Sequence, residues 1–90
     1  MKYREFYNKL GQIGNHLWLV DKNTDKSFLD VYYRNGVHIK LAYSIHLTMP
    51  FMLISTIDNR KMLEHASYSQ KVYTLCSCLA STLIDKRGKL

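Results

Sequence analysis

The stretch LDVYYRNGVHIKL, from Leu29 to Leu41, predicts a β-hairpin and decides the fold expected for this chain. Asn35 and Gly36 lie between two runs rich in β-branched and aromatic residues, and both residue types tolerate the positive φ angles of tight turns. The length of the turn then fixes which residues face each other, because a slip of one residue moves every side chain to the opposite face of the sheet.

Two turns are compatible with this stretch, and they give different faces. A two-residue turn made of Asn35 and Gly36 pairs Arg34 with Val37 and places Asp30 opposite Leu41, on a face shared with Ile39. A three-residue turn that begins at Arg34 gives one fully apolar face, with the pairs Tyr33–Val37, Val31–Ile39 and Leu29–Leu41. We therefore predict the three-residue turn.

This register defines the two faces of the predicted hairpin. The outer face carries Tyr32, Arg34, His38 and Lys40, and Lys40 forms a cross-strand pair of opposite charge with Asp30. The inner face holds the apolar residues Leu29, Val31, Tyr33, Val37, Ile39, Leu41 and Tyr43. We expect the outer face to meet solvent and binding partners.

Helices are predicted at both ends of the chain. At the N-terminal end, apolar residues recur at helical spacing and predict a helix over about residues 2–11. At the C-terminal end, the period from Met62 to Ile84 is again helical. Ser67 and Gln70 have the spacing of a capping box, so the region is either one helix or two, near residues 59–66 and 68–86.

The C-terminal helix carries its basic residues at its end. Lys86 and Arg87 complement the helix dipole there, and Gly88 is a plausible stop.

Strands are predicted between these helices, at residues 16–20, 27–34, 37–46 and, as a fourth, 51–57. Pro50 separates the last two because it cannot donate to a strand ladder. A sheet with one apolar face needs a cover, and the apolar faces of the helices provide it. The sequence therefore predicts an α+β two-layer sandwich: an N-terminal helix, a three- to four-stranded antiparallel sheet and a C-terminal helix.

The composition is that of a single globular domain, which we assign to residues 1–90. With 47% hydrophobic and 22% charged residues, the chain differs from disordered and low-complexity sequences. Thirteen lysine and arginine residues against seven acidic residues give a formal net charge of +6. This charge favours polyanionic or acidic partners through long-range attraction.

Neither a secretory signal nor a membrane span is predicted. The N-terminal residues lack an apolar run followed by a cleavage site of small residues, so we expect a cytoplasmic protein. The most apolar stretch, residues 41–57, is interrupted by polar side chains and Pro50. It is shorter than the roughly 20 apolar residues that span a bilayer, and we expect no membrane partner.

The cysteines and histidines do not form a metal-binding pattern. Cys76 and Cys78 are two residues apart, so a helix points them to different sides, whereas zinc sites need spaced pairs with further ligands. The spacing of the histidines does not converge either: His16, His38, His46 and His65. We expect no metal and no cofactor, with Cys76 in the core and Cys78 half exposed.

The basic and aromatic residues indicate a binding function. Positive side chains can follow a phosphate backbone while aromatic rings stack on bases. We therefore predict a small basic, non-enzymatic domain that binds the backbone of RNA or DNA. Arg34 is the strongest candidate because, at the hairpin tip, it lacks the acidic partner that Lys40 has. The other candidates are His38, Lys40, Tyr32, Trp18, Arg60 and Lys61.

A protein-binding function is about equally compatible with the sequence. The chain holds seven Tyr, three Phe and one Trp, and Tyr, Trp and Arg are enriched in binding hot spots. Such a protein would be an inhibitor or adaptor of the phage or mobile-element type that blocks a host protein or a nucleoprotein complex. Its partner would be an acidic or nucleic-acid-binding protein. The edges of the first and last strands would also allow a homodimer by strand pairing.

Catalysis ranks well behind both. His38 and Lys40 lie on one predicted face and could act together in metal-independent RNA cleavage. No third catalytic group is specified, and the chain has no glycine-rich phosphate loop and no nucleophile elbow. We therefore expect no enzyme.

Overall fold

The computed structural model confirms the predicted α+β architecture, and it describes residues 1–14, 16–21, 27–55, 64 and 66–90. The strands form one antiparallel sheet in the order β1-β2-β3-β4. In chain order, the described elements are α1 (Tyr3–Gly14), β1 (Trp18–Asp21), β2 (Phe28–Asn35), β3 (His38–His46), β4 (Leu53–Ser55), α3 (Ser69–Ala80) and the short 3₁₀ helix η2 (Ile84–Lys86).

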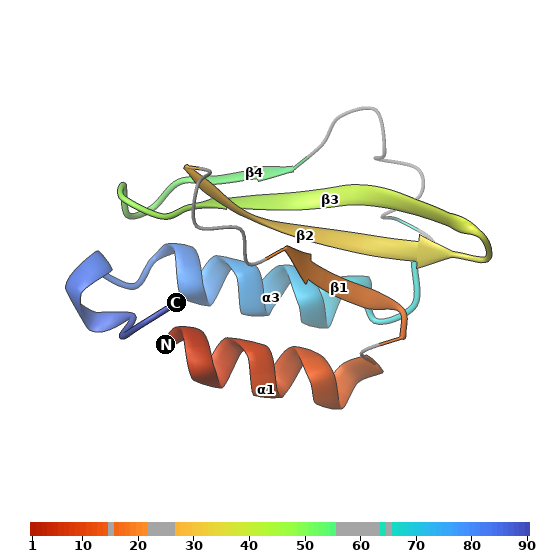
Figure 1. Cartoon of the computed structure of the whole chain (residues 1–90), viewed down its shortest axis with the longest axis horizontal. Helices are drawn as coiled ribbons and strands as arrows, with labels where there is room; N and C mark the ends of the chain where they lie inside the picture. The colour runs from red at the N-terminus through yellow and green to blue at the C-terminus, as the bar shows by residue number, and fades with distance from the viewer. Residues whose placement is uncertain (15, 22–26, 56–63, 65) are drawn as a thin grey trace.

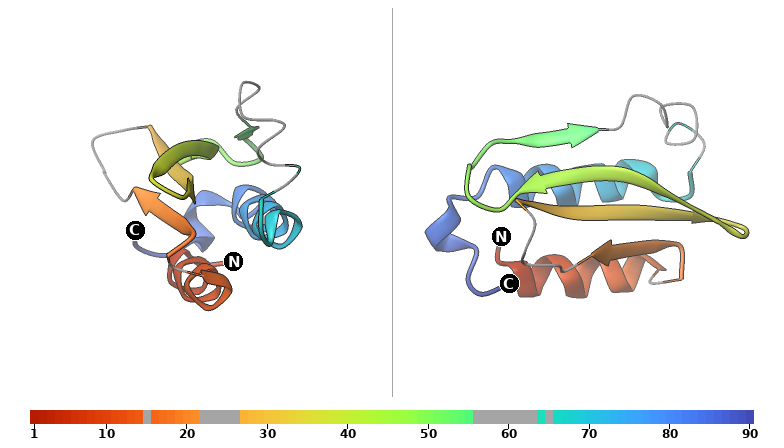
Figure 2. Two further views of the ribbon diagram at one scale, coloured as in Figure 1. Left: turned by 90° about the vertical axis from the view of Figure 1, so that its right-hand side faces the viewer. Right: turned by 45° about the horizontal axis from the view of Figure 1, so that its top comes forward.

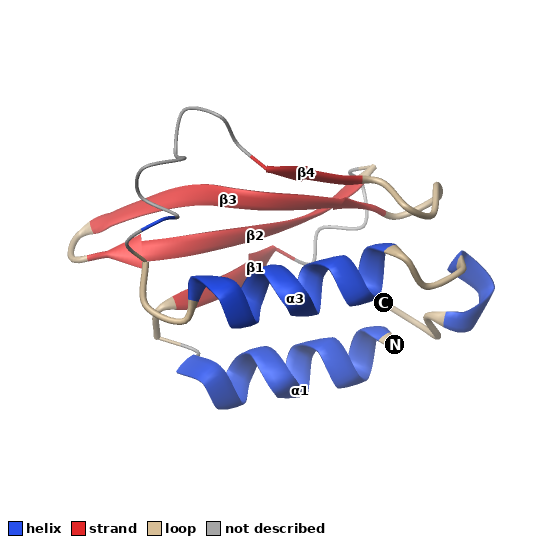
Figure 3. Cartoon of the chain, turned by 180° about the vertical axis from the view of Figure 1, so that it is seen from behind, coloured by secondary structure: helices blue, strands red, loops and turns tan. Residues whose placement is uncertain are grey.

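The sheet and the helices form two layers. Helices α1 and α3 lie side by side against the same face of the sheet (Figures 1 and 3), and the end-on view shows both on one side of the strands (Figure 2). Fully burying one large apolar side chain contributes roughly 1.5–3 kcal/mol, so the core between the layers holds them together. Its members include Phe6, Leu10, Trp18, Leu29, Val31, Tyr43, Ile45, Val72 and Leu79.

The β2–β3 hairpin has a turn that differs from both predicted turns. Asn35 pairs with His38, so the turn residues are Gly36 and Val37. Gly36 has a φ of 63°, the positive value that glycine supplies at the first position of a type II′ hairpin turn. Val37, which we predicted on the inner face, is instead 93% exposed at the tip of the hairpin.

A β-bulge changes the alternation of side chains along β3. The pairing shifts by one residue between Val31 and Tyr32, which leaves Ala42 as an extra residue. Tyr32 then pairs with Leu41, and directly opposite residues share a face. Leu41 and Ile39 therefore lie on the side of the sheet away from the helices, and their predicted inner positions are wrong.

The same shift carries two predicted outer residues to the helix-facing side. Lys40 pairs with Tyr33, which belongs to the core, and His38 follows Lys40 at a spacing of two. The predicted pair of Asp30 with Lys40 is also wrong. The Ser44 hydroxyl donates to Asp30 Oδ1 at 2.7 Å, because Ser44 is the residue opposite Asp30 in this register.

The remaining element boundaries differ modestly from the predicted ones. Helix α1 continues to Gly14 instead of ending near residue 11, and the first strand runs over Trp18–Asp21 instead of 16–20. The fourth strand exists but is short, Leu53–Ser55. The short helix predicted near residues 59–66 falls almost entirely outside the described residues.

Helix α3 starts without the predicted capping box. Its N-cap is Tyr68, which has a left-handed backbone (φ 61°, ψ 22°) and no side-chain cap hydrogen bond. Ser67 instead contacts the sheet: its carbonyl accepts from the Trp18 indole N–H at 3.0 Å, and its backbone N–H donates to the Tyr33 hydroxyl at 3.4 Å. Helix α3 ends at Ala80, six residues before the predicted end at 86.

Arg87 is fully buried where the end of α3, the end of β3 and the start of α1 meet. Its guanidinium group donates to the carbonyls of Thr82 at 3.0 Å, Ala80 at 3.1 Å and His46 at 2.6 Å, and to the Tyr3 hydroxyl at 3.3 Å. The backbone carbonyl of Arg87 also accepts from the Tyr3 N–H at 2.7 Å. Arg87 therefore lies at the carbonyl end of α3, as its predicted role requires, and also joins three elements.

Candidate nucleic-acid interface

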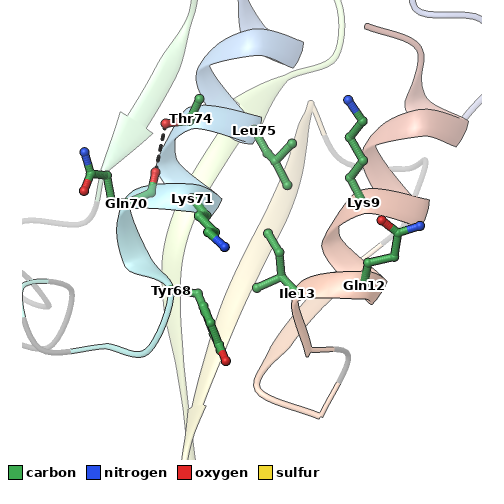
Figure 4. A pocket seen from close by; sticks show the side chains of 8 residues that line it. All are labelled: Lys9, Gln12, Ile13, Tyr68, Gln70, Lys71, Thr74 and Leu75. Carbon is green, nitrogen blue, oxygen red and sulfur yellow. Dashed lines mark hydrogen bonds between the residues drawn. The ribbon is translucent and has the colours of Figure 1, made fainter.

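An open groove of about 790 Å³ lies between the C-terminal half of α1 and the N-terminal half of α3. Figure 4 shows Ile13 and Leu75 pointing toward each other across it, with Lys9 on the α1 side and Lys71 on the α3 side. The groove is lined by Lys9, Gln12, Ile13, Tyr68, Gln70, Lys71, Thr74 and Leu75. We call it the basic groove.

The chemistry of the basic groove favours an anion. Among the described residues that line the groove, Lys9 and Lys71 carry ammonium groups and none carries a carboxylate. Within the part of the chain that the structure describes, neither lysine forms an ion pair. Helix α3 also begins at the groove without a side-chain cap, so the positive end of its dipole adds to the potential there.

Tyr68 presents an aromatic ring at one end of the basic groove. Its side chain is 52% exposed, and the Lys71 ammonium lies 5.7 Å from the ring centroid. Its backbone position is fixed on both sides: the Val72 N–H donates to the Tyr68 carbonyl at 3.0 Å, and the preceding Ser67 is hydrogen-bonded to the sheet. Hydrogen bonds on both sides therefore hold the backbone that carries this ring.

Lys40 and His38 lie on the helix-facing side of the β2–β3 hairpin. Lys40 is paired with Tyr33, and the Tyr33 hydroxyl accepts from Ser67, the neighbour of Tyr68. The hairpin tip and the start of α3 lie at the same end of the molecule (Figure 1). Both residues thus lie on the side of the sheet that the helices cover, in a hairpin whose tip is at the end of the molecule where α3 begins.

The structure divides the residues that the sequence singled out. Tyr32 and Arg34 lie on the face away from the helices, opposite to Lys40 and His38. Trp18 is buried and packs against the Tyr33 ring at a centroid distance of 4.8 Å, so its ring has no surface on which a base could stack. Arg60 and Lys61 lie outside the described residues.

Sequence reasoning missed the residues that form the groove. Tyr68, Lys71 and Leu75 recur at helical spacing, as do Lys9 and Ile13 on the other helix. That spacing shows that each set shares one side of its helix. It does not show that α1 and α3 lie next to each other, which is what brings the two sets together.

The two thiols lie in different environments. Burial raises the pKa of Cys76 to about 12, whereas Cys78 is exposed. Among the described residues, no group of three or more His, Cys, Asp or Glu side chains could hold a metal ion.

We expect a thiol reagent to modify one cysteine in the folded protein. The thiolate is the reactive form, so a raised pKa and burial both protect Cys76, and Cys78 should react alone. Titration with a chromogenic disulfide should give one fast equivalent in buffer and two in denaturant. The Cys78→Ser variant should give no fast equivalent, and fast labelling of that variant would contradict the buried position of Cys76.

Comparison of the chain with protein-family models, with curated proteins and with solved structures gives no match. Among the described helices, none has the length and apolar character needed to cross a membrane.

Proposed function

We propose that the protein is a non-enzymatic module that binds the backbone of a nucleic acid in the basic groove. The observation that carries the proposal is the described lining of this groove. Among the described residues, it holds two lysines without an ion-pair partner, an exposed tyrosine and no carboxylate. Phosphate contacts of this kind provide most of the affinity of sequence-independent binding, because they release counterions from the nucleic acid.

Single-stranded nucleic acid fits this arrangement better than a duplex. Proteins that bind single strands combine a positive groove with aromatic side chains on which bases stack, and each stacked base contributes roughly 1–3 kcal/mol. Tyr68 provides such a ring, and Lys71 beside it provides a charge for the neighbouring phosphate. Lys40 adds a further positive charge on the helix-facing side of the hairpin, with His38 two residues away on the same strand.

The proposal predicts salt-dependent binding that requires Lys9 and Lys71. Wild-type protein should bind labelled single-stranded RNA or DNA saturably at low salt in a fluorescence-anisotropy titration. In the Lys9→Ala/Lys71→Ala variant, the slope of log K against log salt should become shallower by roughly 1.4, about 0.7 for each lost phosphate contact. The affinity at low salt should fall with it.

Two control variants separate the groove from net charge and from general aromatic content. Lys86→Ala/Lys89→Ala removes the same charge at the opposite end of the molecule (Figure 1) and should bind nearly as the wild type does. Tyr68→Ala should weaken binding. Tyr73→Ala, on the same helix and 49% exposed, should not, because Tyr73 does not line the groove.

The outcomes that contradict the proposal are distinct. Absence of saturable binding at low salt would refute nucleic-acid binding, and equal losses in both lysine pairs would refute the groove as its site. The RNA recovered from the titration should run at full length on a denaturing gel. Shortened RNA with the wild type, together with full-length RNA with the His38→Ala variant, would refute the non-enzymatic part of the proposal and support cleavage that requires His38.

A further inference from the structure

The connection between β3 and β4 is organised around the imidazole ring of His46, the last residue of β3. The Nδ1 atom of this ring accepts from the backbone N–H groups of Thr48 and Met49, each at 3.1 Å. The Thr48 hydroxyl lies 3.3 Å from the same nitrogen. We call residues 47–52, which join the two strands, the β3–β4 turn. One side-chain atom therefore satisfies two consecutive backbone donors of this turn.

These contacts require the neutral form of the His46 ring. A neutral imidazole has one nitrogen that accepts and one that carries a hydrogen, whereas the charged imidazolium has two donors and no acceptor. Protonation would place a hydrogen on Nδ1, facing the two N–H groups that now donate to it. Because histidine ordinarily gains its charge as the pH falls from about 8 to about 5, the contacts are present at neutral pH and lost in mild acid.

The same turn holds a residue in a strained backbone conformation. Phe51 has a φ of 64°, in the left-handed region that is unfavourable for a bulky side chain. Its N–H donates to the carbonyl of Ala80, the last residue of α3, at 2.6 Å. Its side chain is 70% exposed, so burial of the ring does not offset the strain. Such conformations persist only where the surrounding contacts impose them.

The base of the turn is held without the imidazole ring. The His46 N–H donates to the Met52 carbonyl at 3.2 Å, and the Leu47 N–H donates to the Ser27 carbonyl at 2.9 Å. The Arg87 guanidinium group donates to the His46 carbonyl at 2.6 Å. A change in the charge of the ring therefore acts on the turn and not on the strand pairing.

Two charged side chains among the described residues flank His46 from neighbouring elements. Arg87 lies on its carbonyl side and opposes a positive charge on the ring. Asp30 favours one: it lies two residues along β2 from Phe28, the partner of His46, and its Oδ1 atom accepts from the Ser44 hydroxyl. The Phe28 ring itself contacts the imidazole edge-on, at a centroid distance of 4.8 Å. Arginine and aspartate ordinarily keep their charges where histidine titrates.

We propose that the β3–β4 turn is a pH-sensitive switch, closed when His46 is neutral and open when its ring gains a proton. Opening releases the N–H groups of Thr48 and Met49 to water and allows Phe51 to leave its left-handed conformation. The switch therefore controls how an exposed aromatic ring is presented. The turn lies at the end of the molecule opposite to the basic groove (Figure 1), so this property is separate from nucleic-acid binding.

An NMR titration of the full chain from about pH 7.5 to about pH 5 tests the switch, because this range covers histidine and lies above the ordinary range of carboxyl groups. The amide proton signals of Thr48 and Met49 should move upfield with the same midpoint as the His46 ring signals. The Phe51 amide signal should move with them. Hydrogen exchange of these three amides, relative to an unstructured peptide at the same pH, should become roughly tenfold faster or more.

Two variants separate the charge of His46 from its role as an acceptor. His46→Asn keeps an acceptor that does not titrate, because an asparagine oxygen can accept from the backbone N–H two residues ahead. The turn of this variant should stay closed over the whole pH range. His16→Asn is the matched control: it removes an exposed histidine between α1 and β1 and should leave the transition unchanged.

Three results would overturn the proposal. They are amide signals of Thr48 and Met49 that stay in place while the His46 ring titrates, a Phe51 amide that does not follow them, and a transition that persists in His46→Asn although circular dichroism shows this variant folded. The Lys9→Ala/Lys71→Ala variant should show the wild-type transition. Failure of the switch and failure of nucleic-acid binding are therefore separate results.

Discussion

Replacing Arg87 by methionine should lower the free energy of unfolding by about 3–5 kcal/mol. Methionine fills part of the space, but it provides no donor for the carbonyls of His46 and Thr82 or for the Tyr3 hydroxyl. A buried acceptor that loses its donor costs about 1–3 kcal/mol. The loss should appear as an earlier midpoint in urea denaturation followed by circular dichroism.

Two further variants show whether the geometry of Arg87 matters, or only its charge. Arg87→Lys keeps the charge but replaces a planar fork of donors by a single ammonium group, so it should recover only part of the lost stability. Lys86→Met is the neighbouring control: Lys86 is exposed, and such a change should stay within about 0.5 kcal/mol. A loss below 1 kcal/mol in Arg87→Met would contradict the role assigned to this side chain.

The second large effect is expected at Trp18. Trp18→Ala should destabilise the protein by about 3–5 kcal/mol, because it removes the largest side chain of the core and leaves a cavity. The ring packs between Tyr33 and Tyr43, at centroid distances of 4.8 and 6.5 Å. Calorimetric unfolding of the variant should show a correspondingly lower midpoint temperature.

Trp18→Phe separates packing from hydrogen bonding. Phenylalanine retains an aromatic ring in the core but cannot donate to the Ser67 carbonyl, so a smaller loss is expected, near 1 kcal/mol for the hydrogen bond plus a term for the smaller ring. Equal losses in Trp18→Ala and Trp18→Phe would mean that the indole N–H, and not the ring, provides the stability.

The layer architecture could be predicted from the sequence, but the hairpin register could not. Hydrophobic period and turn residues indicated two helices and an antiparallel sheet, and these patterns do not depend on single-residue details. The register does depend on them. Gly36 starts a Gly-X turn, and Ala42 adds an unpaired residue in the middle of β3. The run of alternating apolar residues hides that addition, because Ala42 resembles its neighbours.

The candidate site was less predictable than the fold. The prediction selected basic and aromatic residues on one strand face, and the bulge then separated Arg34 and Tyr32 from His38 and Lys40. The groove residues, Lys9 and Lys71 among them, belong to helices that are far apart in the sequence. Their meeting depends on how both helices pack on the sheet, which no local pattern records.

Trp18 can serve as an intrinsic fluorescence probe of the folded structure. It is the only tryptophan in the chain, and two tyrosine rings lie within 6.5 Å of it. Light absorbed by those tyrosines should pass to the indole, and a buried indole emits at shorter wavelength than one in water. The wavelength of the tryptophan emission maximum therefore reports whether β1 stays in contact with Ser67, which precedes α3.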